Sequence, residues 1–119
     1  MAYNSFEDLE VWKRSCVVAE KVYLLFKGSK EYALRDQIMK SAISIPSNIA
    51  EGAERNHNTE FRHFLGIAKG SSAELRTQLE LSARMAIIPR KDVDVLNSEL
   101  REISSMLHSL MVKICPPKN

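Results

Sequence analysis

The sequence predicts an all-α fold, an antiparallel up-down-up-down four-helix bundle with a kink in its second helix, formed by residues 1–119 as a single domain. Apolar residues recur at alternating steps of three and four along four segments, the spacing of helices buried on one side. The 119 residues include only four Gly and four Pro, too few for the turns of a β-sandwich or barrel. Short connections between long helices favour antiparallel neighbours.

The first predicted helix covers about residues 6–27. Ser5 followed three residues later by Asp8 is a variant of the capping box, and Gly28 is a C-terminal stop signal. The positions that we expect to face the core are Leu9, Trp12, Cys16, Ala19, Tyr23 and Phe26.

The second predicted helix covers about residues 30–55 and contains Pro46. Proline removes a backbone donor and clashes with the preceding turn, so the helix should kink or break there. The apolar row stays in phase across Pro46, which favours a kink. That row comprises Leu34, Ile38, Ala42, Ile45 and Ile49.

The third and fourth helices are predicted from Asn58 to Pro89 and from Asp92 to Pro116. Asn58-Thr59-Glu60 is a good helix start, and Asp92 and Asp94 suit the first turn of the last helix. The third row comprises Phe61, Leu65, Ala68, Ser72, Leu75, Leu79, Ser82 and Ala86. The fourth row comprises Val93, Leu96, Leu100, Ile103, Leu107, Leu110 and Ile114.

A second row on the second helix is polar, and a half-polar row follows the third helix. One interpretation is a pair of solvated flanks. Small polar residues such as Ser44 and Asn48 are poor helix formers, however, and they suit a close hydrogen-bonded contact with another helix or another subunit. Pro46 would shape that contact. The residues that we assign to interhelical or intersubunit packing are Trp12, Gln37, Ser44, Pro46, Asn48, Glu51, Arg55, Ser71 and Glu74.

Catalytic and metal-binding motifs are weakly represented. Glu60 and His63 have the Glu-x-x-His spacing of a di-iron bundle, but that chemistry requires a second such pair, and none occurs. Neither a Gly-x-Ser-x-Gly motif nor a phosphate-binding glycine loop is present. Gly52 is better explained by close packing or helix termination. We therefore expect a protein that is not an enzyme, without a cofactor, a bound metal or a small-molecule substrate.

The charge is nearly balanced, with 17 basic and 15 acidic residues and a formal charge of +2. Nucleic-acid binders usually carry a higher and more clustered positive charge. A nucleic-acid contact stays open as an alternative, with Lys13, Arg14, Arg62 and Lys69 as candidate phosphate contacts. Without a signal-like N-terminus or a long apolar run, the sequence predicts a cytoplasmic protein with no membrane contact. We expect Cys16 and Cys115 to be free thiols rather than the two halves of a disulfide.

Several segments together resemble the four-helix bundle family of 23S rRNA-intervening-sequence proteins. The most specific is SIPSNIAEG at residues 44–52, and the resemblance spans nearly the whole chain. The other segments are FEDLEVW at 6–12, YALRDQI at 32–38, EFRHFLGIAKGS at 60–71, and Glu74-Leu75.

The resemblance implies a bacterial protein, encoded in some members by an insertion within the gene for 23S ribosomal RNA, that forms a ring-like homopentamer. The accessory protein of diversity-generating retroelements is similar, and it is regarded as a basic pentamer that engages nucleic acid and a reverse transcriptase. The family has no settled biochemical function. Five copies of this chain would sum to a charge of about +10. We therefore expect an oligomeric scaffold, with RNA binding by the oligomer as the alternative.

Overall fold

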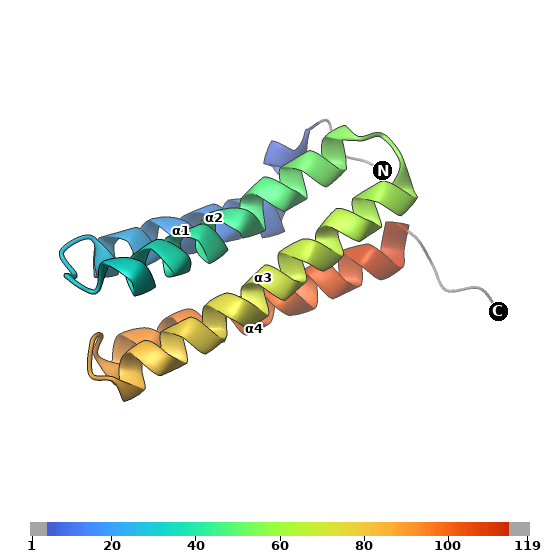
Figure 1. Cartoon of the computed structure of the whole chain (residues 1–119). Helices are drawn as coiled ribbons and strands as arrows, with labels where there is room; N and C mark the ends of the chain where they lie inside the picture. The colour runs from blue at the N-terminus through green and yellow to red at the C-terminus, as the bar shows by residue number, and fades with distance from the viewer. Residues whose placement is uncertain (1–4, 115–119) are drawn as a thin grey trace.

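Four long α-helices pack around one hydrophobic core, which confirms the predicted all-α bundle (Figure 1). The structure is a computed structural model, and it describes residues 5–114. A short 3-10 turn, η1 (Phe6–Asp8), precedes α1 (Glu10–Phe26), α2 (Tyr32–Glu54), α3 (Asn58–Arg84) and α4 (Arg90–Ile114). The chain reverses direction at each of the short connections between helices (Figure 1).

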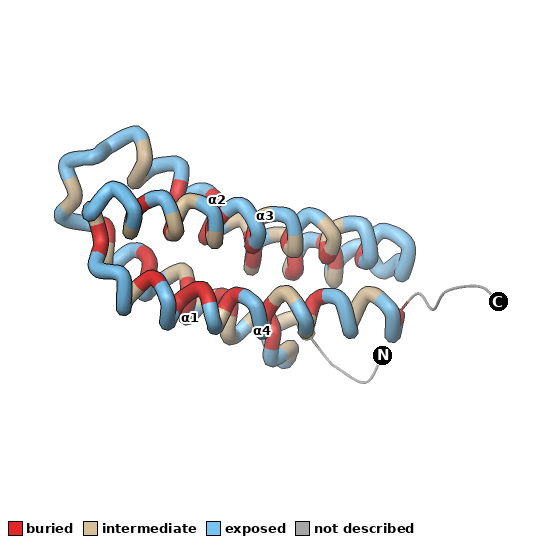
Figure 2. The backbone as a smooth tube through the Cα atoms, turned by 90° about the horizontal axis from the view of Figure 1, so that it is seen from below, coloured by how far each residue is buried: buried red, intermediate tan, exposed pale blue. Residues whose placement is uncertain are grey.

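Each helix contacts two neighbours, in the order α1–α2–α3–α4 and back to α1. The contact between α2 and α3 is the most extensive, and that between α4 and α1 is the smallest. The buried residues of the tube in Figure 2 lie on the inward sides of the helices.

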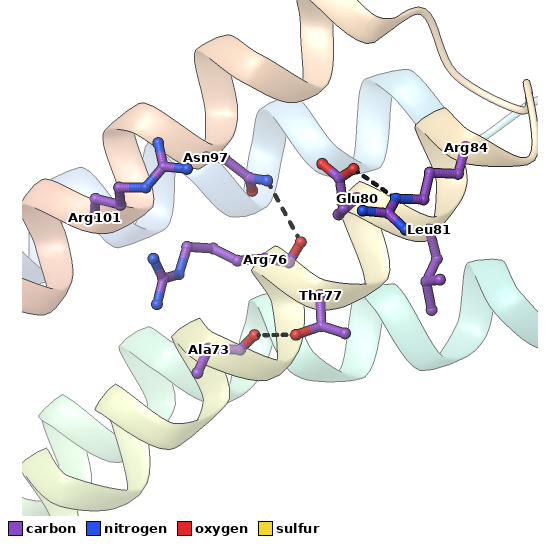
Figure 3. A pocket seen from close by; sticks show the side chains of 8 residues that line it. All are labelled: Ala73, Arg76, Thr77, Glu80, Leu81, Arg84, Asn97 and Arg101. Carbon is purple, nitrogen blue, oxygen red and sulfur yellow. Dashed lines mark hydrogen bonds and ion pairs between the residues drawn. The ribbon is translucent and has the colours of Figure 1, made fainter.

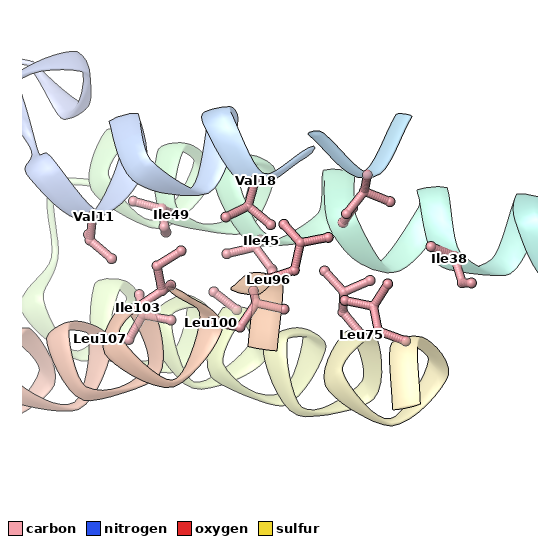
Figure 4. Close-up of a cluster of buried hydrophobic side chains, with 14 of the residues drawn as sticks. Val11, Val18, Ile38, Ile45, Ile49, Leu75, Leu96, Leu100, Ile103 and Leu107 are labelled. Atoms are coloured by element: carbon pink, nitrogen blue, oxygen red, sulfur yellow. The ribbon is translucent and has the colours of Figure 1, made fainter. Parts of the chain in front are cut away.

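The core confirms three of the four predicted rows. Ile38, Ile45 and Ile49 of α2 are fully buried, as are Leu65, Leu75 and Leu79 of α3. In α4, Leu100, Ile103 and Leu107 are fully buried. Figure 4 shows side chains from all four helices meeting in this cluster. The 3-4 spacing therefore located the buried side of α2, α3 and α4.

The deepest row of α1 differs from the predicted one: Phe26 is buried as predicted, but Leu9, Trp12 and Ala19 are only partly buried against the core. The buried residues are Val11, Ser15, Val18, Val22 and Phe26, whereas Tyr23 is 53% exposed. Two apolar stripes run along α1, about 100° apart. Ser15 lies in the deeper stripe, where its hydroxyl donates to the Trp12 carbonyl at 2.8 Å. That hydrogen bond lets a polar side chain occupy a core position, so a reading of apolar spacing selects the shallower stripe.

The ends of the first helix also differ from the prediction. Ser5 caps η1, because its hydroxyl accepts a hydrogen bond from the backbone N–H of Glu7 at 3.1 Å. The backbone of Leu9 is extended, so α1 starts afresh at Glu10. The helix ends at Phe26, and Gly28 does not adopt the left-handed conformation of a glycine stop.

α2 is helical from Tyr32 to Glu54 with Pro46 inside it, so no break occurs there, and a kink at Pro46 stays a prediction. Near its end, Gly52 is buried against α3. A Cβ atom on Gly52 would lie 2.6 Å from the Cβ of Phe64. Close packing of the two helices therefore explains this glycine.

α3 ends earlier than predicted, at Arg84, and Ala86 is exposed rather than in the core row. Ala86 has a φ of 59°, in the left-handed region. The N–H of Ile87 bonds to the Ser82 carbonyl at 2.9 Å, and that of Ala86 to the Ala83 carbonyl at 3.0 Å. This is the Schellman ending of a helix, with alanine at the position that glycine usually holds. The following Ile88 is buried.

Candidate self-association and nucleic-acid surfaces

The polar rows of α2 and α3 face each other inside the chain. The hydroxyls of Ser44 and Ser71 lie 2.8 Å apart, and the Ser41 hydroxyl donates to Glu74 at 3.0 Å. The Asn48 amide donates to the Ser44 carbonyl at 2.8 Å. We call this contact the α2–α3 seam. Ser44, Ser71 and Glu74 thus take part in hydrogen bonds between α2 and α3.

The end of the seam is closed by Arg55. Its guanidinium pairs with Glu51 one turn earlier at 2.9 Å and lies over the Phe64 ring, 5.0 Å from the centroid. Gln37, at the other end of the row, is exposed. A role of any of these residues between subunits stays a prediction, because the described contacts all lie within one chain.

Arg14 is held inside the chain. It forms a bidentate ion pair with Glu99 of α4, with N–O distances of 2.8 and 2.7 Å, and a further pair with Glu102 at 3.2 Å. The hydrogen bond with Glu99 raises the pKa of Arg14 further, and the same bond lowers the pKa of Glu99. We call this contact the α1–α4 seam. All three guanidinium nitrogens of Arg14 are engaged by residues of α4, which disfavours a phosphate contact, and that contact stays a prediction.

The other three candidate cations form no ion pair within residues 5–114. Lys13 is exposed on α1, away from Arg62 and Lys69, which lie two turns apart on α3. Both α3 cations border hollows along the groove between α3 and α4. Arg62 lies opposite Met111, and Lys69 lies beside His108. The structure thus places Arg62 and Lys69 along one groove, in separate hollows, and Lys13 on another helix.

A third hollow continues the α3–α4 groove, lined by Arg76, Thr77 and Glu80 of α3 and by Asn97 and Arg101 of α4 (Figure 3). Glu80 is paired with Arg90 at 2.7 Å and with Arg84 at 2.9 Å. Hydrogen bonds from Arg90 and then Arg84 lower the pKa of Glu80 to about 2. The carboxylate is therefore neutralised by its own partners.

A broad apolar surface covers the groove between α1 and α2. The second stripe of α1, at Trp12, Cys16, Ala19 and Tyr23, follows the core positions by one residue, and so do Met39, Ile43, Pro46 and Ala50 on α2. Tyr23 and Met39 line one hollow, so the two stripes face the same groove. We call these eight residues the α1–α2 face. None of the eight is charged, but Lys27 and Arg35 line the same hollow as Tyr23 and Met39. Tyr23 and Ile43 are 53% and 52% exposed, and the other six residues are half-buried.

Trp12 lies near one end of this face. It is half-buried, and its ring meets the Phe6 ring edge to face with the centroids 5.3 Å apart. The Cys16 thiol, also half-buried, has a pKa raised by burial and then by Glu20. Cys115 lies outside the described residues, so the structure does not address a disulfide.

No helix within residues 5–114 combines the length and the apolar character needed to span a bilayer. In the same part of the chain, the His, Cys, Asp and Glu side chains form no group of three or more that could hold a metal ion.

Comparison with known proteins identifies the family of this chain. The model of the 23S rRNA-intervening sequence protein family matches residues 7–109. The chain belongs to that family. The match runs from η1 through most of α4 and so includes both seams, the α1–α2 face and all the named hollow-lining residues except Met111.

A solved structure similar to this chain comes from Bacteroides thetaiotaomicron and is described as a protein with unknown function from the S23 ribosomal protein family. It is 30% identical, with a TM-score of 0.81, and the match covers 85% of this chain and 97% of that one. No functionally curated protein matches the chain.

Two features of the surface were missed by sequence reasoning. The apolar stripe of α1 was assigned to the core, so the α1–α2 face went unnoticed; the repeated offset of one residue from the core rows is the signal that would have found it. Arg101 and Asn97 were not singled out either. Seven-residue spacing of Arg62, Lys69 and Arg76 is visible in the sequence, but their facing residues on α4 depend on helix pairing.

Proposed function

We propose that this chain is a cytoplasmic, non-enzymatic scaffold that assembles into the homopentameric ring implied by the family resemblance, with the α1–α2 face as a contact surface between copies. The single observation that carries the proposal is that face. Tyr23 and Ile43 are each more than half exposed on a surface whose eight residues include no charge. Depletion of charge at the centre of an exposed apolar patch is typical of protein interfaces.

The distribution of ionisable groups supports a binding role rather than catalysis. The large pKa shifts belong to Arg14, Glu80 and Arg90, and each of these groups is in an ion pair that links two helices of the bundle. Catalytic groups, in contrast, converge on a cleft with unmatched partners.

Light scattering coupled to size-exclusion chromatography tests the assembly. At micromolar concentration we expect a mass five times the 13.5 kDa of one chain. Tyr23→Glu and Ile43→Glu should each shift the protein to monomers, because a carboxylate would be buried in the contact. Val95→Glu is the matched control, since Val95 is 64% exposed on α4, away from the face. A monomeric wild-type protein would overturn the proposal.

RNA binding is a second candidate function, favoured by the row of cations along the α3–α4 groove. Arg62, Lys69 and Arg76 succeed one another at two-turn intervals over about 21 Å. None forms an ion pair with the residues that the structure describes. In an oligomer, each added copy repeats this row.

Filter binding of a structured RNA tests this candidate, with affinity measured from about 50 to 200 mM salt. Counterion release predicts a steep fall in affinity as salt rises. The double variant Arg62→Gln with Lys69→Gln should weaken RNA binding. Lys13→Gln is the control, because it removes a positive charge from α1, away from the groove. Absence of RNA retention at about 50 mM salt would sink this candidate.

A further inference from the structure

The outer side of α3 carries a row of six exposed residues with a single formal charge among them. We call this surface the α3 row, and its members are His63, Ile67, Gly70, Glu74, Thr77 and Leu81. Ile67 and Leu81 are each 40% exposed. The Leu81 side chain points away from α4 (Figure 3). Exposed apolar side chains among few charges are typical of a surface that another protein covers.

Glu74 is the one charge of the α3 row, and it lacks a cation within the chain. Its carboxylate accepts a hydrogen bond from the Ser41 hydroxyl at 3.0 Å but forms no ion pair within residues 5–114. At one end of the α1–α2 face, Lys27 and Arg35 line the hollow. Lys27 has no ion pair in that range either, and Arg35 is paired only with the adjacent Asp36, at 3.4 Å. The α3 row thus offers a carboxylate, and the rim of the α1–α2 face offers cations, which makes the two surfaces complementary in charge.

The symmetry of a five-membered ring limits where the partner of the α1–α2 face can lie. Each copy in such a ring uses two different surfaces, which face two neighbours about 108° apart. The four helices contact one another in a cycle, so the neighbouring sides of the bundle are turned about 90° from the α1–α2 face, and the α3–α4 groove about 180°. The partner surface therefore lies on the α2–α3 side or on the α4–α1 side.

The α2–α3 side suits a buried contact better than the α4–α1 side does. The ion pairs of Arg14 with Glu99 and Glu102 cross the α4–α1 side. Covering them would remove water from three charged groups, which is costly. The α3 row adjoins the α2–α3 side, because Glu74 is bonded to Ser41 of α2. Ring closure and the cost of desolvation thus select the same surface.

We infer that the α3 row of each copy binds the α1–α2 face of the next copy, with the long axes of the bundles along the axis of the ring. The inference rests on the proposed function, because it identifies the surface that the α1–α2 face contacts. The contact is heterologous: each copy offers its α1–α2 face to one neighbour and its α3 row to the other.

The heights of the two surfaces along the bundle agree with this contact, since all copies of a ring lie at the same height. Ser71 is bonded to Ser44, so Ile67, four residues before Ser71, lies level with the stretch of α2 between Pro46 and Ala50. That stretch belongs to the α1–α2 face. An apolar side chain of the α3 row therefore meets an apolar part of the face.

The charged groups also come within reach of each other. Glu74 lies level with Ser41, to which it is bonded. Arg35 precedes Ser41 by six residues, or about 9 Å along the helix. The extended side chains of an arginine and a glutamate together span that distance. The carboxylate of one copy can therefore pair with the guanidinium of the next.

Two variants, each blocked on one surface, test the contact by light scattering coupled to size-exclusion chromatography. Ile43→Glu blocks the α1–α2 face and Ile67→Glu blocks the α3 row, so each alone should be monomeric at micromolar concentration. Mixed in equal amounts at hundreds of micromolar, they should form a dimer of twice the 13.5 kDa of one chain, through the one pair of intact surfaces. The higher concentration is needed because a single contact lacks the mutual support of a closed ring.

Val112→Glu is the matched control for Ile67→Glu. Val112 is 41% exposed, against 40% for Ile67, and it lies on α4, which contributes to neither surface. This variant should keep the mass of the wild-type protein. Circular dichroism should show unchanged helical content in all three variants. Thr77→Arg, a second change in the α3 row, should also give monomers that form a dimer with Ile43→Glu.

The outcomes separate this inference from the proposed function. A monomeric wild-type protein would overturn both. If Ile43→Glu is monomeric while Ile67→Glu and Thr77→Arg keep the wild-type mass, the α1–α2 face is a contact surface but the α3 row is not its partner, and only this inference fails. It also fails if the blocked variants are monomeric and folded but form no dimer on mixing.

The charge pair has a separate readout, the concentration at which the oligomer dissociates. Glu74→Lys should raise that concentration about three- to tenfold, because it places a cation beside Lys27 and Arg35 of the next copy. Adding Arg35→Glu should restore the wild-type value to within about twofold, since the pair is then reversed. Adding Lys13→Glu, on the outer side of α1, should not restore it. Equal recovery by the two additions would reveal only a general effect of charge and would contradict the pairing of Glu74 with Arg35.

Discussion

The α2–α3 seam and the α1–α4 seam hold the same bundle together in different ways. α2 and α3 approach each other closely, with Gly52 against Phe64 and neutral hydroxyls bonded across the contact. α1 and α4 share the smallest contact, and Arg14 spans it with charged hydrogen bonds. Steric fit should therefore dominate the first seam, and electrostatics the second.

The largest effect is expected from Gly52→Ala. Its new Cβ would lie 2.6 Å from the Phe64 Cβ, so the helices must move apart. We expect a loss of about 1–3 kcal/mol in the free energy of unfolding, measured by urea denaturation. Gly70→Ala is the control, because a Cβ there meets no atom within 4 Å; it should stabilise α3 by about 1 kcal/mol. Equal effects of the two substitutions would show that the close approach is unimportant.

Arg14→Ala should be the most damaging change in the α1–α4 seam. Removing the bidentate pair with Glu99 should lower the free energy of unfolding by about 1–2 kcal/mol, the usual range for hydrogen bonds between charged groups at partly exposed positions. Lys13→Ala changes the adjacent exposed residue and should alter stability by less than about 0.5 kcal/mol. Indistinguishable melting curves for Arg14→Ala and Lys13→Ala would contradict this account.

Acid should weaken the α1–α4 seam selectively. Arg14 lowers the pKa of Glu99 in the folded state. The ion pair of Glu99 therefore contributes its full share to the free energy of unfolding above the unfolded pKa of about 4.3, and that contribution is lost as the pH falls through the folded pKa. Between pH 6 and 3, the wild-type protein should therefore lose more stability than Arg14→Ala. The lowered pKa of Glu80 acts in the same direction in both proteins, so their difference isolates the seam. Parallel pH profiles would refute the assignment.

The smallest effect is expected from the serines of the α2–α3 seam. A double-mutant cycle with Ser44→Ala and Ser71→Ala should give a coupling energy of about 0.5–1 kcal/mol, typical of a neutral hydrogen bond. Because neither group ionises, the coupling should be the same at pH 7 and pH 4. A coupling that disappears at pH 4 would show that the two seams are not electrostatically distinct.

The sequence predicted the fold well wherever one helix side is uniformly apolar. α2, α3 and α4 have one such side each, and their core rows follow directly. α1 has two apolar stripes, and only the packing of four helices decides which of them is inside. Ser15 illustrates the difficulty, since a buried serine is unremarkable once its bond to the Trp12 carbonyl is known.

The candidate sites were harder to predict because they depend on pairs of residues far apart in the chain. Arg14 and Lys13 are adjacent and both basic, yet only Arg14 meets acidic residues, which lie on α4. Likewise, Arg76 gains its place in the third hollow from Asn97 and Arg101. Residue type indicates the chemistry that is available, whereas the helix pairing decides which groups are already satisfied.

The strained backbone at Ala86 marks a position where a single substitution should stabilise the protein. Its left-handed backbone, with a φ of 59°, strains an L-residue by about 1 kcal/mol, and Ala86→Gly should relieve part of that strain. A rise of a few degrees in melting temperature would demonstrate it. Natural proteins lie just above the stability that selection requires, and they tolerate such strain when the margin suffices. The turn between α3 and α4 is therefore a place to strengthen the protein without altering the surfaces assigned to binding.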